Sequence, residues 1–152
     1  MRGRPRRSIV LTTGCFDILH IGHVRLLHEA AALGDILVVG LNTDEMARRK
    51  STPGQPRPLF MLEGRLAVIA ALGCVDYVTW FGETEPSALI LQLAPNHFVK
   101  GCDWEGRRPL PEDPACEKVG ARVHFLGRPP REGPKESSSD LVSSVGSPDR
   151  VD

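Results

Sequence analysis

The feature that most constrains the fold is a regular alternation of short apolar runs with helix-like segments. Asp35 to Leu41 reads DILVVGL and is continuously apolar after its first residue, which is typical of a strand buried on both faces of a parallel sheet. The order strand, helix repeats about five times along the chain. We therefore expect an α/β fold, a Rossmann-like doubly wound parallel five-stranded sheet with helices on both faces.

The expected elements follow from apolar periodicity and from glycine and proline positions. The strands are expected at residues 8–13, 35–41, 76–81, 97–101 and 121–127, and the helices at 21–33, 42–50, 59–72, 85–94 and 111–120, with a proline-rich loop at 51–58. After Pro129 only residues 137–145 have a pattern that suits a further short helix. We expect a basic flexible N-terminus at 1–8, a single domain at 9–146 and a flexible tail at 147–152.

Composition excludes several classes of protein. The 19 basic and 19 acidic residues cancel, whereas a domain that grips nucleic acid along its length usually has a basic excess. No apolar run approaches the roughly 20 residues that span a bilayer, and the apolar stretch behind MRGRPRRS is too short for a signal peptide. The four cysteines are scattered, which favours reduced thiols. We expect a cytoplasmic protein with no nucleic-acid or membrane partner.

A candidate phosphate site follows the first expected strand, in the segment TGCFDILHIGHVRL. Ligands of doubly wound sheets bind at the carboxyl ends of the strands. His20 and His23 fall in the first turn of the next helix and on one face of it, where free N–H groups attract anions. Gly22 would let a phosphate approach the backbone, and the imidazoles would donate hydrogen bonds to it. The structural alternative is that His20 caps the helix and His23 is partly buried.

The segment TTGCFDILHIGHVRLLHEAAALGDILVVGLNTDE resembles the opening of the nucleotidyltransferases with an H-x-G-H signature, and most closely their cytidylyltransferase-like branch. Within that branch, RPLFMLEGRLAVIAALGCVDYVTWF and FVKGCDW are similar to the adenylyltransferase domain of bacterial ADP-heptose synthase, and the likeness runs from Ile9 to Val145. The resemblance implies transfer of AMP from ATP to a sugar 1-phosphate, with pyrophosphate released. It also implies Mg²⁺ as the cofactor, held mainly by phosphates without direct protein ligands.

The same resemblance assigns roles to individual residues. His20, His23 and Lys50 would be catalytic. The nucleotide would be bound by Thr13, Gly14, Cys15, Phe16, Asp17, Gly22, Lys100, Gly101, Asp103, Trp104, Ser137, Ser138 and Ser139. The substrate phosphate would be bound by Arg57, which shares a loop with Lys50, and by Arg65, which on periodicity alone lies on a polar helix face. Asp17 could instead be a turn residue that bonds its own backbone, and the serines could be a plain tail.

Other readings stay open. The residues DWEG are also similar to glycerol 3-phosphate cytidylyltransferases, which would make CTP and a phosphorylated polyol the substrates. Class I aminoacyl-tRNA synthetases share HIGH but need far more chain, and PKESSSD is a poor match to their second signature. A non-catalytic nucleotide-binding module is the alternative outside the enzymes. The resemblance further implies a homodimer, and a separate sugar kinase that supplies the sugar 1-phosphate.

Overall fold

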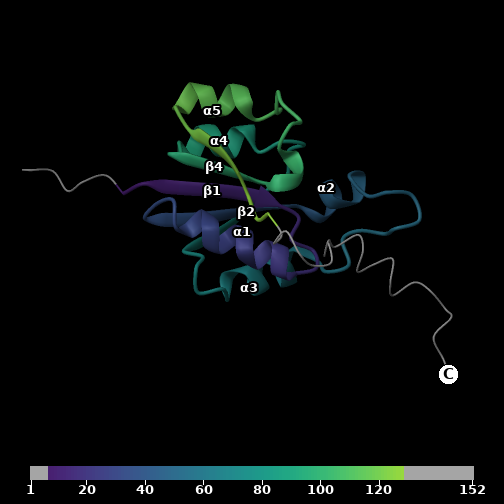
Figure 1. The fold of residues 1–152 in the computed structure, drawn as a ribbon. Coiled ribbons are helices and arrows are strands. Elements are labelled where there is room, and N and C mark those ends of the chain that lie inside the picture. Colours follow the sequence, from purple (N-terminus) through teal and green to yellow (C-terminus); the bar gives the residue numbers. More distant parts are fainter. Residues whose placement is uncertain (1–6, 129–152) are drawn as a thin grey trace, which may run out of the picture.

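A five-stranded parallel sheet forms the centre of the computed structural model, which describes residues 7–128 (Figure 1). The strand order is β3-β2-β1-β4-β5, which confirms the expected doubly wound sheet. The strands are β1 (Ile9–Gly14), β2 (Ile36–Asn42), β3 (Tyr77–Phe81), β4 (His97–Gly101) and β5 (Arg122–Leu126). The helices are α1 (Ile21–Ala31), α2 (Asp44–Arg49), α3 (Leu62–Ala70), α4 (Ser87–Leu93) and α5 (Asp113–Val119), with a 3-10 turn, η1 (Cys102–Trp104).

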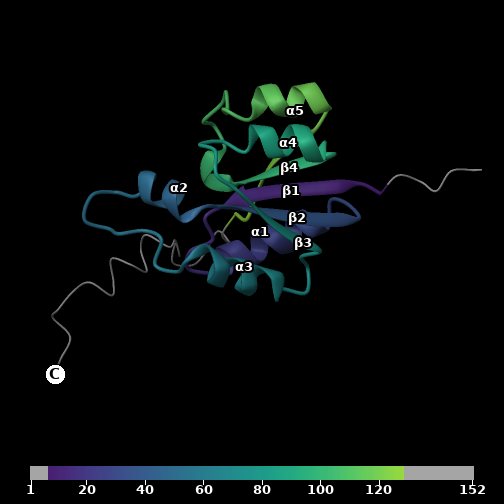
Figure 2. The ribbon, with the colours of Figure 1, turned by 180° about the vertical axis from the view of Figure 1, so that it is seen from behind.

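Helices cover both faces of the sheet, because the strands alternate their side chains between two apolar layers. In Figure 1 and, from behind, in Figure 2, α1 and α3 lie on one face and α4 and α5 on the other. The layer under α1 and α3 contains Val10, Leu27, Val39, Leu41, Ile69 and Val99. The layer under α4 and α5 contains Leu11, Val38, Ile90, Phe98, Ala115 and Cys116.

The loops that can bind a ligand all lie at one edge of the sheet because of its topology. All five strands run parallel, so their carboxyl ends share that edge. β1 lies between β2 and β4, and the direction in which successive strands are added reverses there. In open α/β sheets ligands bind at this switch point, outside the carboxyl ends of the strands. The β1–α1 loop and η1 both follow strands that end there.

Most element boundaries differ from the sequence prediction by one to three residues, and at two helices the structure gives a physical reason. α3 begins at Leu62 and not at Leu59, because the backbone N–H groups of Leu59 and Phe60 donate to Asp17. α1 ends at Ala31, short of the expected residue 33, and the chain then turns close to β1. A Cβ at Gly34 would lie 2.8 Å from Val10 Cγ2, so only glycine fits this turn without a shift.

Several expectations concern residues outside the described range. The basic N-terminus before Arg7, the helix at 137–145 and the tail at 147–152 lie wholly or largely there. Within residues 7–128 no helix combines the length and the apolar character needed to cross a membrane. All four cysteines are free thiols, as the scattered spacing suggested.

Candidate active site

The two histidines of the HIGH segment lie together at the start of α1. His20 is the N-cap, with extended backbone (φ −136°, ψ 170°), and its Nδ1 accepts a hydrogen bond from the Gly22 N–H at 3.1 Å. Because Nδ1 is the acceptor, the ring hydrogen of His20 is on Nε2. The rings of His20 and His23 stack with their centroids 3.8 Å apart. The cap uses the Gly22 N–H, one of the helix N-terminal N–H groups that were expected to attract a phosphate.

His23 is held as a neutral imidazole. Burial, and then the neighbouring His20, lower the pKa of His23 to about 4, and a hydrogen bond with the Ile18 backbone offsets part of this. The ring of Phe16 packs against His23, with centroids 5.0 Å apart. A neutral imidazole carries one N–H donor, which the Ile18 backbone accepts in this conformation, so His23 donates to a phosphate oxygen when it gives up that bond or gains a second proton.

The loop between β1 and α1 is tightly folded. Phe16 has a φ of 48°, in the left-handed region that non-glycine residues rarely adopt. A Cβ at Gly14 would lie 3.1 Å from the Phe16 ring, so the absence of a side chain at Gly14 lets the ring pack there. Backbone strain of this kind clusters at functional sites. The strain is maintained because Asp17 and Arg65 tie the loop to distant segments.

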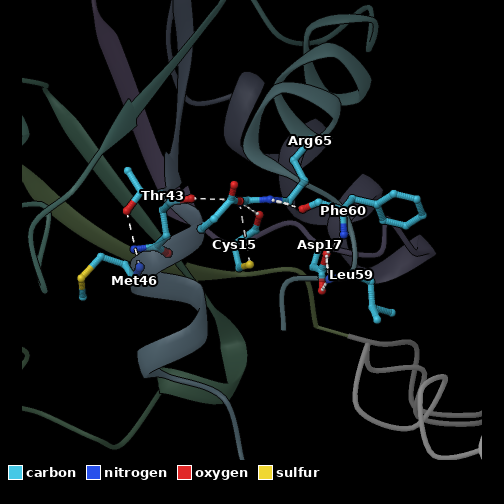
Figure 3. A network of polar contacts seen from close by, with 9 residues as sticks. Cys15, Asp17, Thr43, Met46, Leu59, Phe60 and Arg65 are labelled. Atoms are coloured by element: carbon cyan, nitrogen blue, oxygen red, sulfur yellow. Dashed lines mark hydrogen bonds and ion pairs between the residues drawn. The ribbon is translucent and has the colours of Figure 1, made fainter. Parts of the chain in front are cut away.

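Asp17 links the β1–α1 loop to the segment before α3. Its carboxylate accepts hydrogen bonds at 2.9 Å from the backbone N–H groups of Leu59 and Phe60 (Figure 3). Asp17 is buried, with 5% of its surface exposed. It therefore orients the loop through residues more than 40 positions away, and not through its own backbone as the turn alternative supposed.

Arg65 is a second buried link. Nε donates to the Phe60 carbonyl at 2.9 Å, and Nη1 donates to the Cys15 carbonyl at 2.8 Å. Nη2 donates to the Asn42 carbonyl at 2.9 Å and to Asp44 Oδ1 at 2.7 Å. Figure 3 shows the guanidinium among these segments. Each nitrogen thus has a protein acceptor and the residue is 1% exposed, so Arg65 holds the strand ends together where a phosphate contact was expected.

Cys15 contributes to this site through its backbone. The pKa of its thiol is raised, mainly by burial, although the positive charge of Arg65 lowers it in part. The thiol is therefore protonated at neutral pH and is a poor nucleophile. The carbonyl, by contrast, is fixed by Arg65, whose Nη1 donates to it.

Lys50 and Arg57 lie on the segment that follows α2. Thr43 caps α2 by accepting from the Met46 N–H at 3.4 Å, and Lys50 ends the helix as its exposed C-cap. Lys50 Nζ donates to the Thr84 carbonyl at 3.0 Å, in the loop between β3 and α4. Arg57 Nη2 is buried and has no hydrogen-bond partner among the described residues. Arg57 Nη2 is therefore still able to donate to a substrate phosphate, whereas the nitrogens of Arg65 already have protein acceptors.

Lys100 lies at the carboxyl end of β4 and is paired. Its Nζ lies 2.6 Å from Glu112 Oε1, with both side chains at most 10% exposed, and 4.3 Å from the centroid of the Trp104 ring. Glu112 was not among the predicted site residues. A lysine that ends a buried strand needs a counter-charge, and this requirement is the signal that could have prompted a search for one. Asp103 is exposed, and its Oδ1 lies beside Gly101. A Cβ added at Gly101 would be 2.4 Å from this oxygen.

The chain returns to α1 after β5. Gly127 has a φ of 77°, and a Cβ there would lie 2.9 Å from Leu26 Cβ and 3.3 Å from the Gly22 carbonyl oxygen. Its N–H donates to Glu29 at 2.9 Å. The end of the described chain thus passes the first turns of α1, close to the histidines. Ser137, Ser138 and Ser139, which the sequence analysis assigned to the nucleotide, lie outside the described residues.

Two groups of predicted site residues therefore emerge. The carboxyl ends of β1, β2 and β4, with the segments that follow them, contain Thr13, Gly14, Cys15, Phe16, His20, Gly22, His23, Lys50, Arg57, Lys100, Gly101, Asp103 and Trp104. Those committed to internal links are Asp17 and Arg65. Among residues 7–128 no three histidine, cysteine or carboxylate side chains gather as a metal site.

The parallel order 3-2-1-4-5 and the histidine pair at a helix N-terminus define a class, the α/β nucleotide-binding enzymes that handle phosphates at the first strand–helix turn. The profile of the cytidylyltransferase-like family matches residues 11–125. The chain belongs to the cytidylyltransferase-like family, and it is a nucleotidyltransferase.

Relatives and solved structures agree with this assignment. The chain is 49% identical over 121 residues to a D-beta-D-heptose 1-phosphate adenylyltransferase of Bordetella bronchiseptica, which covers 80% of this chain and 74% of the relative. It is 43% identical over 123 residues to a bifunctional protein HldE of Syntrophotalea carbinolica, covering 81% of this chain but only 24% of that longer protein. A lipopolysaccharide core biosynthesis protein of Thermoplasma volcanium has the same fold, with a TM-score of 0.67 at 28% identity, over 80% of this chain and 97% of that one.

Proposed function

We propose that the chain transfers AMP from ATP to a sugar 1-phosphate, namely a heptose 1-phosphate, and releases pyrophosphate and an ADP-sugar. The observation that carries the proposal is the stacked pair of His20 and His23 at the N-terminus of α1, beside the switch point of the sheet. The nucleotide and the sugar are supported by the name of the 49% identical relative from Bordetella bronchiseptica.

The reaction needs positioning and charge stabilisation more than covalent chemistry. An oxygen of the acceptor phosphate attacks the α-phosphorus of ATP in line; a new P–O bond forms and the bond to the β-phosphate bridging oxygen breaks. His20 and His23 donate hydrogen bonds to phosphate oxygens as charge develops. Lys50, now on the Thr84 carbonyl, and Arg57, with its free Nη2, supply positive charge from the α2–α3 side.

Mg²⁺ would enter with the triphosphate and be held mainly by phosphate oxygens. The nearby carboxylates suit direct coordination poorly, because Asp17 accepts from two backbone N–H groups and Asp44 accepts from Arg65. The ion would neutralise charge on the phosphates. A separate sugar kinase would supply the sugar 1-phosphate.

The alternative is a cytidylyltransferase that joins CMP from CTP to glycerol 3-phosphate. It is favoured by the residues Asp103 to Gly106, which match that group, and by Cys102, where the heptose branch usually has a second glycine. These residues form η1 and the turn after it, beside Lys100 at the end of β4.

One experiment separates the two substrate pairs. Pyrophosphate release is measured with purified protein and Mg²⁺, pairing ATP and CTP each with heptose 1-phosphate and with glycerol 3-phosphate. We expect release with ATP and the heptose. Release only with CTP and glycerol 3-phosphate would establish the alternative, and no release with any pair would contradict both.

We also propose that two copies associate through β3 and α3. β3 is an edge strand, and its Tyr77 and Trp80 are 62% and 57% exposed. Val68 on the adjoining α3 is 51% exposed, and the preceding Leu59, Phe60 and Met61 are also exposed. Exposed large apolar side chains on an edge strand and on the helix beside it are typical of a protein–protein contact.

A further inference from the structure

Besides His23 Nδ1 and Arg57 Nη2, two buried side-chain polar atoms near the carboxyl edge have no hydrogen-bond partner in the part of the chain that the structure describes. They are Asn42 Nδ2, a donor, and Glu112 Oε2, an acceptor, in residues that are only 6% and 4% exposed. Buried polar groups in folded proteins are nearly always hydrogen-bonded, to protein, water or ligand. At the ligand edge of a nucleotidyltransferase, the bound substrate is a natural partner for both.

Both atoms belong to the same face of the sheet. The strand residues that pack under α4 and α5 include Leu11 of β1, Val38 of β2 and Phe98 of β4. Side chains alternate along a strand, so Thr13, Asn42 and Lys100 are on this face too, at the carboxyl ends of their strands. Gly40 agrees with this, since a Cβ there would lie 2.9 Å from Leu89 of α4 and 3.2 Å from Thr13 Cγ2.

These three residues, here called the polar row, span three adjacent strands. β1 lies between β2 and β4. The register pairs Thr12 with Val99, which sets Thr13 beside Lys100. On the other side of β1, the register pairs Thr13 with Gly40 of β2. Asn42 therefore lies two residues beyond this pair toward the carboxyl end of β2. The unpartnered atom of Asn42 is at one end of the polar row, and the Lys100–Glu112 pair with its unpartnered oxygen is at the other.

The polar row and the histidine pair lie on opposite sides of the same edge, since α1 covers the other face of the sheet (Figure 1). In-line transfer needs this separation, because the attacking oxygen and the departing pyrophosphate must be on opposite sides of the α-phosphorus. If the triphosphate binds at α1, the acceptor has to approach from the side of α4 and α5.

We propose that the polar row binds the acceptor substrate, a phosphorylated polyhydroxyl compound, and that Asn42 determines the affinity for it. Asn42 donates to a hydroxyl or phosphate oxygen of the acceptor. At the other end Lys100 attracts the phosphate and Glu112 accepts from a hydroxyl. A sugar phosphate offers both groups. The inference rests on the proposed function and adds where and by which residue the acceptor is selected.

The test compares Asn42→Leu, which keeps the shape and removes the amide, with Thr12→Val as a matched control. Thr12 is equally buried and polar, but it lies on the α1 face, where its hydroxyl donates to the Val99 carbonyl. For each protein we would measure both KM values from pyrophosphate release, and the Tm with and without heptose 1-phosphate. Asn42→Ala tests the same contact if leucine is not accommodated.

For Asn42→Leu we expect the KM for the acceptor to rise about tenfold or more, as for the loss of a hydrogen bond to a charged group, with the KM for ATP within about twofold. The Tm without ligand should stay within about 2 °C, because an unpartnered donor is removed, and the rise in Tm caused by heptose 1-phosphate should disappear. Thr12→Val should lower the Tm and change neither KM.

An unchanged acceptor KM in Asn42→Leu and Asn42→Ala, or an equal rise in both KM values, would overturn the polar row as the acceptor site. A fall in Tm like that of Thr12→Val with normal KM values would make Asn42 a structural residue and would overturn it as well. Failure of the unmodified protein to turn over any substrate pair would instead contradict the proposed function.

Discussion

Arg65 Nη2 lies 2.7 Å from Asp44 Oδ1, and this ion pair joins α3 to the first residue of α2. The guanidinium side chain is fully buried and the carboxylate is 19% exposed. Lys50 ends the same short helix. The placement of a proposed catalytic lysine therefore depends on a buried contact one element away, and the same guanidinium also fixes the Cys15 carbonyl in the loop that leads to the histidine pair.

We predict that Arg65→Ala lowers the free energy of unfolding by about 3–5 kcal/mol, because it leaves a partly buried carboxylate and several carbonyls without their donor. Urea unfolding measures the change. Arg49→Ala is the control, since Arg49 pairs with Glu45 on the exposed face of α2 and should contribute less than about 1 kcal/mol. A stable Arg65→Ala protein with a raised KM for the acceptor would instead support the phosphate contact expected from the sequence.

Stability should fall on acidification because of His23. Its folded-state pKa of about 4 is below the ordinary value of 6.5, so between these values the unfolded chain binds a proton that the folded chain does not. The free energy of unfolding should therefore be highest above pH 6.5 and fall by up to about 3 kcal/mol toward pH 4.

Urea unfolding at several pH values, in the unmodified protein and in His23→Gln, tests this. The variant should lose most of the slope. A smaller slope should remain, because burial also lowers the pKa of His124, which pairs with His97 in the sheet. Equal slopes in both proteins would show that His23 is not buried as a neutral imidazole.

Association through β3 should be sensitive to a single charge. We predict that Trp80→Glu converts a dimer to a monomer, since it places a carboxylate in the exposed apolar surface of the edge strand. Light scattering after size exclusion gives the mass directly. Leu91→Glu is a suitable control, because Leu91 is 42% exposed on α4, on the opposite face of the sheet. A monomeric unmodified protein, or an unchanged dimer in Trp80→Glu, would contradict the proposed interface.

The fold was predictable because its signals are local. Continuous apolar runs identified the buried parallel strands, and β4 has the predicted bounds of His97–Gly101. The start of α3 was not predictable, because the N–H groups of Leu59 and Phe60 are used by Asp17, more than 40 residues earlier. No local pattern reports such a contact.

The site was predictable where it depends on one segment. The position of His20 and His23 at the start of α1 followed from their spacing, and His20 caps the helix as the structural alternative supposed, while the catalytic role of both stays a prediction. Arg65 and Glu112 were not predictable, because acceptors from several separate segments compensate the buried arginine and the partner of Lys100 lies 12 residues away. Burial of charge is decided by such tertiary partners.

We propose that the paired histidines of α1 carry nucleotidyl transfer to a phosphorylated acceptor. The most direct measurement is kcat for pyrophosphate release from ATP with heptose 1-phosphate, in the unmodified protein and in His20→Ala, with circular dichroism to verify that both are folded. We predict a fall of about 10²–10³-fold, as for other residues that stabilise transition-state charge. A folded His20→Ala protein with an unchanged kcat would contradict it.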